Sequence, residues 1–149
     1  MILLVHLLFG AAIGSVVKNI PIAIILAFLS HYFLDFIPHT EYPIGSIRKQ
    51  PWQRALPEIT KLFLDFCLGI LLIFLLFKNQ PIVYICAFLA ILPDGFTVLN
   101  NHFPNKILEL HRRIHIEKIH FLKNKKISIF WRIFSQVIVV ILSIMLLKI

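Results

Sequence analysis

Apolar runs long enough to cross a membrane dominate this chain and leave it few other ways to fold. Four or five such runs follow one another, separated by prolines and short polar turns. A helix needs roughly 20 apolar residues to span the hydrocarbon core of a bilayer. Hydrophobic residues make up 59% of the chain and the mean hydropathy is +0.88, well above a soluble domain. The sequence therefore predicts an all-α integral membrane helical bundle, with residues 1–149 forming a single membrane domain.

Prolines and tight turns set the expected ends of the helices. Proline suits the first turn of a helix, and the residue before a proline disfavours helical geometry. Five transmembrane helices are expected at about residues 2–18, 21–37, 57–77, 81–99 and 128–148. A basic amphipathic segment at 105–124 is expected to lie on the membrane surface. The first run lacks a basic start and a small-residue cleavage motif, so we expect it to remain as a helix rather than act as a signal peptide.

Lysine and arginine gather on one side of this predicted topology. One side holds eleven of them, against Lys18, Lys78 and Lys148 on the other. The eleven are Arg48, Lys49, Arg54, Lys106, Arg112, Arg113, Lys118, Lys123, Lys125, Lys126 and Arg132. Cytoplasmic loops carry such an excess, so we expect a multi-pass protein with a cytoplasmic N-terminus and an outside C-terminus. The same rule accounts for the net charge of +8 without a specific nucleic-acid partner.

Two stretches of the chain suggest a duplicated helical hairpin. "PIAIILAFL" at 21–29 aligns with "PIVYICAFL" at 81–89, an offset of 60 residues. At an offset of 59, His6 aligns with Asp65 and Asp35 aligns with Asp94. We therefore expect a tandem repeat of the hairpins 2–38 and 57–100, related by an axis along the membrane normal.

Ionisable side chains of the predicted helices fall in one shallow layer at the cytoplasmic side. They are His6, His31, Asp35, Asp65 and Asp94. An unpaired aspartate inside a membrane helix costs about 2.5–3.5 kcal/mol, so these carboxylates require compensation. A divalent metal ion, zinc or manganese, with histidine partners would supply it. His31 and Asp35 are four residues apart, which places them on one helical face where both could bind one ion.

The loop and the basic segment add further candidate ligands. His39 follows Pro38 and could ligate from the loop or lie at the mouth of the site. His111 and His115 are four residues apart on the apolar stripe of the 105–124 segment, which would press them against the bundle. Arg112 and Arg113 could bind a substrate phosphate. The alternative is a basic surface helix attracted to anionic lipid, with histidines that only cap or flank helices.

Four short motifs resemble a known family. They are "LSHYFLD" (29–35), "LPD" (92–94), "HRRIH" (111–115) and His6-x-x-x-Gly10. The chain is similar in these elements to membrane-bound metal-dependent hydrolases that include the LexA-binding inner-membrane type. The resemblance implies a metal site in a bacterial inner-membrane protein. Here the "SHxxLD" element precedes "LPD", and Phe96 stands where that family has a further acid.

These patterns lead to a functional hypothesis and two rivals. The chain is expected to hydrolyse an ester, foremost a lipid phosphoester or another membrane-associated substrate, with Asp94 or Asp65 as general base if not a ligand. Membrane lipid is the expected partner. A structural metal that ties helices together is one rival, and a metal or proton transporter is the other. Transport is disfavoured because the outer halves of the predicted helices are almost purely aliphatic.

Overall fold

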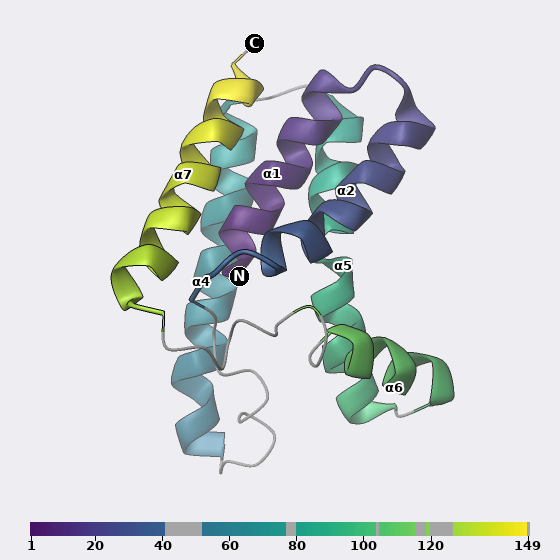
Figure 1. Cartoon of the computed structure of the whole chain (residues 1–149), viewed down its shortest axis with the longest axis vertical. Coiled ribbons are helices and arrows are strands. Elements are labelled where there is room, and N and C mark those ends of the chain that lie inside the picture. Colours follow the sequence, from purple (N-terminus) through teal and green to yellow (C-terminus); the bar gives the residue numbers. More distant parts are fainter. Residues whose placement is uncertain (41–51, 77–79, 104, 116–118, 120–126, 149) are drawn as a thin grey trace.

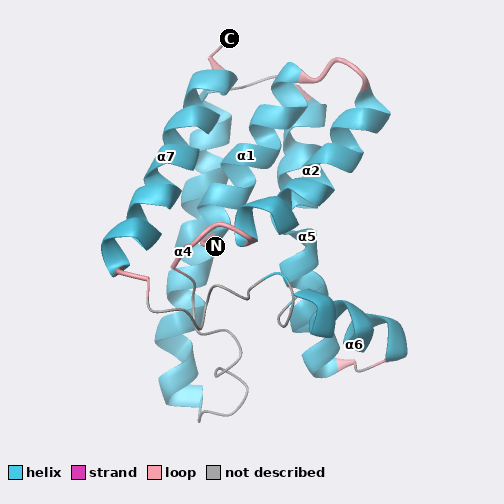
Figure 2. Cartoon of the chain, viewed as in Figure 1, coloured by secondary structure: helices cyan, strands magenta, loops and turns pink. Residues whose placement is uncertain are grey.

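The chain folds as a bundle of helices. The computed structural model describes residues 1–40, 52–76, 80–103, 105–115, 119 and 127–148, and every longer regular element among them is an α-helix. The helices are α1 (Leu3–Val16), α2 (Ile20–Asp35), α4 (Trp52–Leu76), α5 (Pro81–His102), α6 (Lys106–Arg113) and α7 (Ile129–Leu147) (Figures 1 and 2). The prediction of an all-α protein is confirmed. Most of the 39–56 loop and the end of the 105–124 segment lie outside the described residues.

Three of these helices are long and apolar enough to cross a membrane. Their spans are Leu56–Leu76, Pro81–Asn100 and Ile129–Leu147. The helices α1 and α2 are apolar but have only 14 and 16 residues, which at 1.5 Å per residue is about 21 and 24 Å. Both are shorter than the roughly 30 Å hydrocarbon core. The structure thus indicates a membrane protein, with three full-length spans among the described residues rather than the expected five.

The helix α7 illustrates a surface suited to lipid. Its outward side chains Ile133, Val137, Ile141 and Met145 repeat every fourth residue and are 47–60% exposed. Its buried residues include Gln136 and Ser143. A helix with apolar side chains outside and polar ones inside reverses the pattern of soluble proteins, as expected where the surroundings are hydrocarbon.

Two helices contain an internal proline. The helix α4 begins at Trp52 rather than at the expected Pro57, and α5 ends at His102, three residues past the expected end at 99. A proline inside a helix removes one backbone hydrogen bond, so Pro57 was expected to start its helix, whereas Pro93 lay inside the expected helix 81–99. Beside Pro93, the carbonyls of Ala90 and of Pro93 itself accept hydrogen bonds from side chains.

The helix α1 is the centre of the bundle. It packs against α2, α4, α5 and α7, and Figure 1 shows it between α2 and α7 with α4 and α5 behind. Glycines allow its close approach to α5: a Cβ added at Gly10 would lie 2.6 Å from the Cβ of Ala90 and 2.6 Å from the carbonyl oxygen of Cys86. Gly14 faces Val83 in the same way, at 3.0 Å from its Cα. This spacing of small residues is the standard means of close helix packing in membranes.

We predict that Gly10→Ala separates α1 from α5 and destabilises the bundle by about 1–3 kcal/mol, the usual cost of overpacking. The added methyl group would meet backbone of α5, which cannot rotate away. Gly95→Ala is the matched control, because nothing lies within 4 Å of a Cβ at that helical position. Thermal unfolding of both variants in detergent measures the difference, and equal stability would contradict the packing described.

Candidate metal centre

Asp35 is the hub of a buried polar cluster at the end of α2. Its side chain is 0% exposed. Its Oδ2 lies 3.0 Å from Nε2 of His31, one helical turn earlier, and 3.1 Å from Nε2 of His115, which follows α6. The two imidazole Nε2 atoms are themselves 3.1 Å apart. Three ligand-type atoms, two from α2 and one from the residues after α6, thus meet at one point.

Hydrogen bonds on the far side of each ring fix which nitrogen faces the cluster. Nδ1 of His31 lies 2.7 Å from the carbonyl oxygen of Ala90 in α5, and a carbonyl only accepts, so Nδ1 must carry the hydrogen. Nδ1 of His115 lies 3.3 Å from Oγ1 of Thr97, whose hydroxyl can donate to the carbonyl of Pro93. The neutral His115 ring has two tautomers here: Nδ1–H donates to Oγ1 of Thr97, or Nδ1 accepts from that hydroxyl while Nε2–H donates to Asp35. Nε2 of neutral His31 is bare in either case, and Nε2 of His115 is bare in the first.

The tautomer with both Nε2 atoms bare is arranged to receive a cation. Two lone pairs and a carboxylate oxygen then converge, and a metal ion or an added proton among them would satisfy all three. A tetrahedral ion with bonds of about 2.0–2.1 Å holds its ligands about 3.3 Å apart. The three separations of Asp35, His31 and His115 are 3.0, 3.1 and 3.1 Å. Donation of the distal N–H to a protein oxygen is the usual support of a metal-bound histidine.

Asp94 completes a group of four. Its Oδ1 lies 3.7 Å from Nε2 of His31, and one ligand atom from each of His31, Asp35, Asp94 and His115 lies within 4.8 Å of every other. Its side chain is 23% exposed, whereas those of the other three are at most 2% exposed. This cluster can hold a metal ion, with one ligand open to the outside.

Three further nitrogens lie near Oδ1, the second carboxylate oxygen of Asp35. Oδ1 lies 2.6 Å from the amino group of Met1, 3.2 Å from Nε2 of His6 and 3.7 Å from Nε2 of His39. Nδ1 of His39 donates to the carbonyl of Ile37, at 2.6 Å, so its Nε2 also faces the carboxylate. His6 is fully buried and stacks on His31 with ring centroids 4.2 Å apart, but neither of its nitrogens has hydrogen-bond geometry to a partner. Both predicted ligands thus border the group of four without belonging to it.

Asp65 is not among the four residues, although it was expected in the same layer. Its Oδ2 accepts a hydrogen bond from the backbone N–H of Leu4, at 3.1 Å. That N–H belongs to the first turn of α1, where no residue of the helix itself can accept. Asp65 therefore caps α1 from α4. The physical reason is that the residue preceding α1, Ile2, has no side-chain acceptor of its own.

His111 holds α6 against α5. Its Nε2 donates to the carbonyl of Pro93 at 3.0 Å, and its Nδ1 accepts from the hydroxyl of Tyr32 at 3.4 Å. Both ring nitrogens are thus engaged with protein, and partial burial lowers the pKa of His111. The contacts make His111 a positioning residue for His115, one helical turn later.

The two arginines expected to bind phosphate contact Glu109 instead. Arg112 donates from Nε and Nη2 to the carboxylate at 2.8 and 2.6 Å, and Arg113 donates from Nε at 3.1 Å. Asn100 of α5 donates to the same carboxylate at 2.9 Å. The bonds from Arg112, Asn100 and Arg113 lower the pKa of Glu109 to about 2. Glu109 therefore stays ionised at neutral pH and links α6 to α5.

Several residues of the site carried no signal in the sequence. Tyr32 and Thr97 orient the imidazoles of His111 and His115, and the carbonyls of Ala90 and Pro93 accept from side chains. A backbone carbonyl leaves no mark in a sequence. The proline in "LPD" was the one available hint, because it disturbs the backbone hydrogen bonding of α5 around these carbonyls.

No family model, no curated protein and no solved structure matches this chain. The geometry of the cluster is therefore the main guide to function.

Proposed function

We propose that this protein is a membrane-embedded, metal-dependent hydrolase that acts on an ester, foremost a phosphoester of a lipid. The observation that carries the proposal is the set of three ligand atoms in Asp35, His31 and His115, separated by 3.0–3.1 Å. Nδ1–H of His31 donates to a carbonyl oxygen and Nδ1 of His115 lies 3.3 Å from a hydroxyl oxygen, an arrangement that suits metal ligands. The "LSHYFLD", "LPD" and "HRRIH" motifs that resemble membrane-bound hydrolases contain all four members of the cluster.

Two imidazole nitrogens and two carboxylates fit zinc or manganese. When bound, such an ion lowers the pKa of a coordinated water and polarises an ester oxygen. His31, Asp35 and His115 would hold the ion, and His6 and His39 would stabilise the second oxygen of Asp35. Asp94 is the most exposed of the four and could either ligate or serve as general base.

Hydrolysis would proceed by attack of water on the phosphorus or acyl carbon of the ester. The bond from that atom to the alkoxy oxygen breaks, and a hydroxyl group takes its place. A carboxylate at the position of Asp94 would accept the proton of the attacking water and return it to the leaving alkoxide. Neither an oxidant nor a reductant is needed, because atoms and charge balance with water alone.

The site would lie at the cytoplasmic face of the inner membrane, as the distribution of lysine and arginine favours. The exposed residues of α6 support a position in the membrane interface: Ile107 is 81%, Leu110 60% and Ile114 48% exposed, and Arg113 lies beside them. An apolar stripe flanked by basic side chains binds headgroups and acyl chains together. Membrane lipid is thus the expected partner.

We further propose that α1 and α2 enter the membrane with the three long helices, giving five membrane helices and a duplicated hairpin. Asp35 and Asp94, which align in the repeat, are both members of the cluster. His6 and Asp65, the other aligned pair, have different partners. In Figure 1 the first turns of α4 extend below the level at which α1 begins, so the short α1 and α2 would place their ends, and with them the site, inside the length of the longer helix.

A structural metal is the second candidate. The near-complete burial of His31, Asp35 and His115 favours it, because structural sites are closed. The partial exposure of Asp94 favours an open, catalytic position.

The test is metal analysis of the purified protein followed by assays of phosphate or fatty-acid release from a panel of lipid esters. A stoichiometric divalent ion with turnover is expected. Bound metal without turnover on any ester would support the structural candidate, and protein that binds no divalent ion would overturn both.

A further inference from the structure

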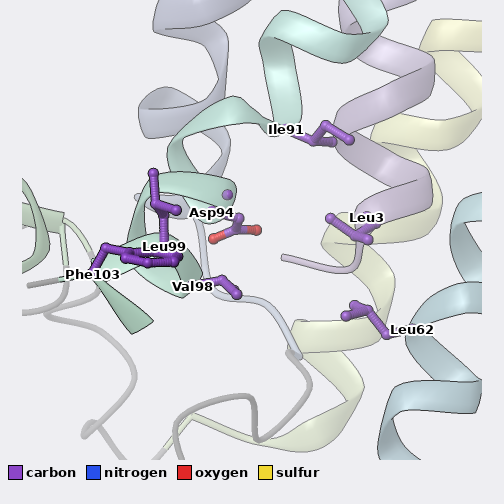
Figure 3. A pocket seen from close by; sticks show the side chains of 8 residues that line it. Leu3, Leu62, Ile91, Asp94, Val98, Leu99 and Phe103 are labelled. Carbon is purple, nitrogen blue, oxygen red and sulfur yellow. The ribbon is translucent and has the colours of Figure 1, made fainter. Parts of the chain in front are cut away.

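An apolar cavity of about 360 Å³ ends at Asp94 of the metal cluster. Figure 3 shows the carboxylate of Asp94 among side chains from α1, α4 and α5. The lining residues are Leu3, Leu62, Ile91, Asp94, Gly95, Val98, Leu99 and Phe103, so Asp94 is the one charged residue in this lining. The volume is in the range of small-molecule sites.

The position of the cavity identifies the kind of molecule that would fill it. Its walls include two candidate membrane spans, α4 and α5, and the exposed side chains Leu99 and Phe103. Water finds no hydrogen-bond partners in an apolar hollow of this kind, whereas a hydrocarbon chain from the bilayer can pack against its walls. At the inner end the same hollow reaches a member of the candidate metal site. A molecule that uses both ends must carry a hydrocarbon chain joined to a polar group.

We propose that this cavity, the acyl cavity, binds the hydrocarbon chain of an amphiphilic ester and places its ester group at Asp94. The inference rests on the proposed function and adds the substrate class: an ester with a long apolar chain, taken from the bilayer rather than from water. The metal cluster would act on the head of that molecule while α1, α4 and α5 hold its tail.

Gly95 provides a way to fill the acyl cavity without disturbing its walls. The residue lines the cavity, and nothing lies within 4 Å of a Cβ built on it. A leucine at this helical position should also fold well, because glycine is a poor helix former. Gly95→Leu is therefore expected to reduce kcat/KM for long-chain esters by at least about 10-fold, since methylenes lose contact with the pocket. Short-chain esters with the same head group should lose much less, because they have few methylenes to place in the acyl cavity.

A second apolar hollow supplies a matched control. It lies on α4 and α5, has a volume of about 570 Å³ and is lined by Phe66, Cys67, Ile70, Leu71, Phe74 and Tyr84, with no carboxylate or imidazole. Filling it with Cys67→Phe should leave chain-length preference unchanged.

The assay is hydrolysis of a series of nitrophenyl esters and phosphoesters with chains from acetyl to palmitoyl, by metal-loaded protein. Binding is measured separately with a palmitoyl lipid that carries a photoreactive diazirine, with crosslinks mapped by mass spectrometry. Crosslinks at Val98 or Leu99 that are reduced by Gly95→Leu but not by Cys67→Phe would support the acyl cavity. This holds even if no ester is hydrolysed, because absence of turnover would count against the hydrolase proposal and not against the cavity. Equal loss of short and long substrates, or crosslinking that ignores Gly95→Leu, would overturn the acyl cavity.

Discussion

Asp35→Asn is expected to remove the divalent ion from the purified protein. Asparagine keeps the shape of the side chain but loses the negative charge that five nitrogens approach within 3.7 Å. Loss of a ligand should weaken metal affinity by more than the roughly 10–100-fold effect of removing a second-shell partner. Metal content by mass spectrometry and chelator competition measure the change. Release of bound metal should also lower thermal stability, because an ion that binds only the folded state stabilises it.

Asp65→Asn is the matched control for this prediction. Both aspartates are buried in apolar helices, but the carboxylate of Asp65 accepts from Leu4 N–H and belongs to no metal group among the described residues. Loss of a helix cap costs about 0.5–2 kcal/mol, so this variant should be less stable yet keep its ion. His31→Ala is a second probe of the cluster in case Asp35→Asn fails to fold. Full metal content in both His31→Ala and Asp35→Asn, or equal metal loss in Asp65→Asn, would contradict the assignment.

The sequence predicted those contacts of the site that depend on the spacing of residues along one helix. His31 and Asp35 are one helical turn apart, and the structure has them 3.0 Å apart. The same argument placed His111 and His115 on the face of α6 that meets the bundle, and both contact α5 residues. Spacing along a helix is fixed by its geometry, so it transfers from sequence to structure with little loss.

The sequence predicted the depth of the ionisable side chains in the membrane but not their bonding partners, because side chains at one depth can bond different neighbours. Asp65 and His6 lie near the start of α1 as the expected layer requires, yet Asp65 bonds backbone while His6 approaches Asp35. The choice depends on how α4 is rotated against α1, and rotation depends on close contacts such as Gly69 against Leu7. Apolar helices offer many such rotations, and hydropathy alone does not distinguish them.

Spacing along the helix also does not predict which of His111 and His115 is a candidate ligand and which is a positioning residue. His111 and His115 are both histidines and lie one helical turn apart. The two ring nitrogens of His111 contact Tyr32 and Pro93, whereas Nε2 of His115 faces Asp35. The backbone has π-helical rather than α-helical geometry at Ile114 and His115. No sequence pattern used here anticipates that geometry.

His115→Ala and His111→Ala are therefore expected to differ sharply. His115→Ala removes a ligand atom 3.1 Å from Asp35, so it should lose most of its metal affinity and, if the protein hydrolyses esters, its turnover. His111→Ala removes only the bonds to Pro93 and Tyr32. It should keep the ion when metal is supplied in excess, while looser placement of α6 lowers kcat by about 10–100-fold. His111→Gln, whose amide can still donate to the Pro93 carbonyl, should recover part of that loss.

The measurements are metal affinity, thermal unfolding and ester hydrolysis at saturating metal, made on the same preparations. A catalytic site predicts loss of metal in His115→Ala alone and loss of turnover in both variants. A structural metal predicts lower metal content and lower thermal stability in His115→Ala, with no turnover in the unmodified protein to lose. If α6 is only a lipid anchor, both variants would keep their ion and their stability and differ from the parent only in affinity for anionic vesicles. That outcome would mean that the approach of His115 to Asp35 contributes nothing to metal binding, and it would overturn the metal centre proposed here.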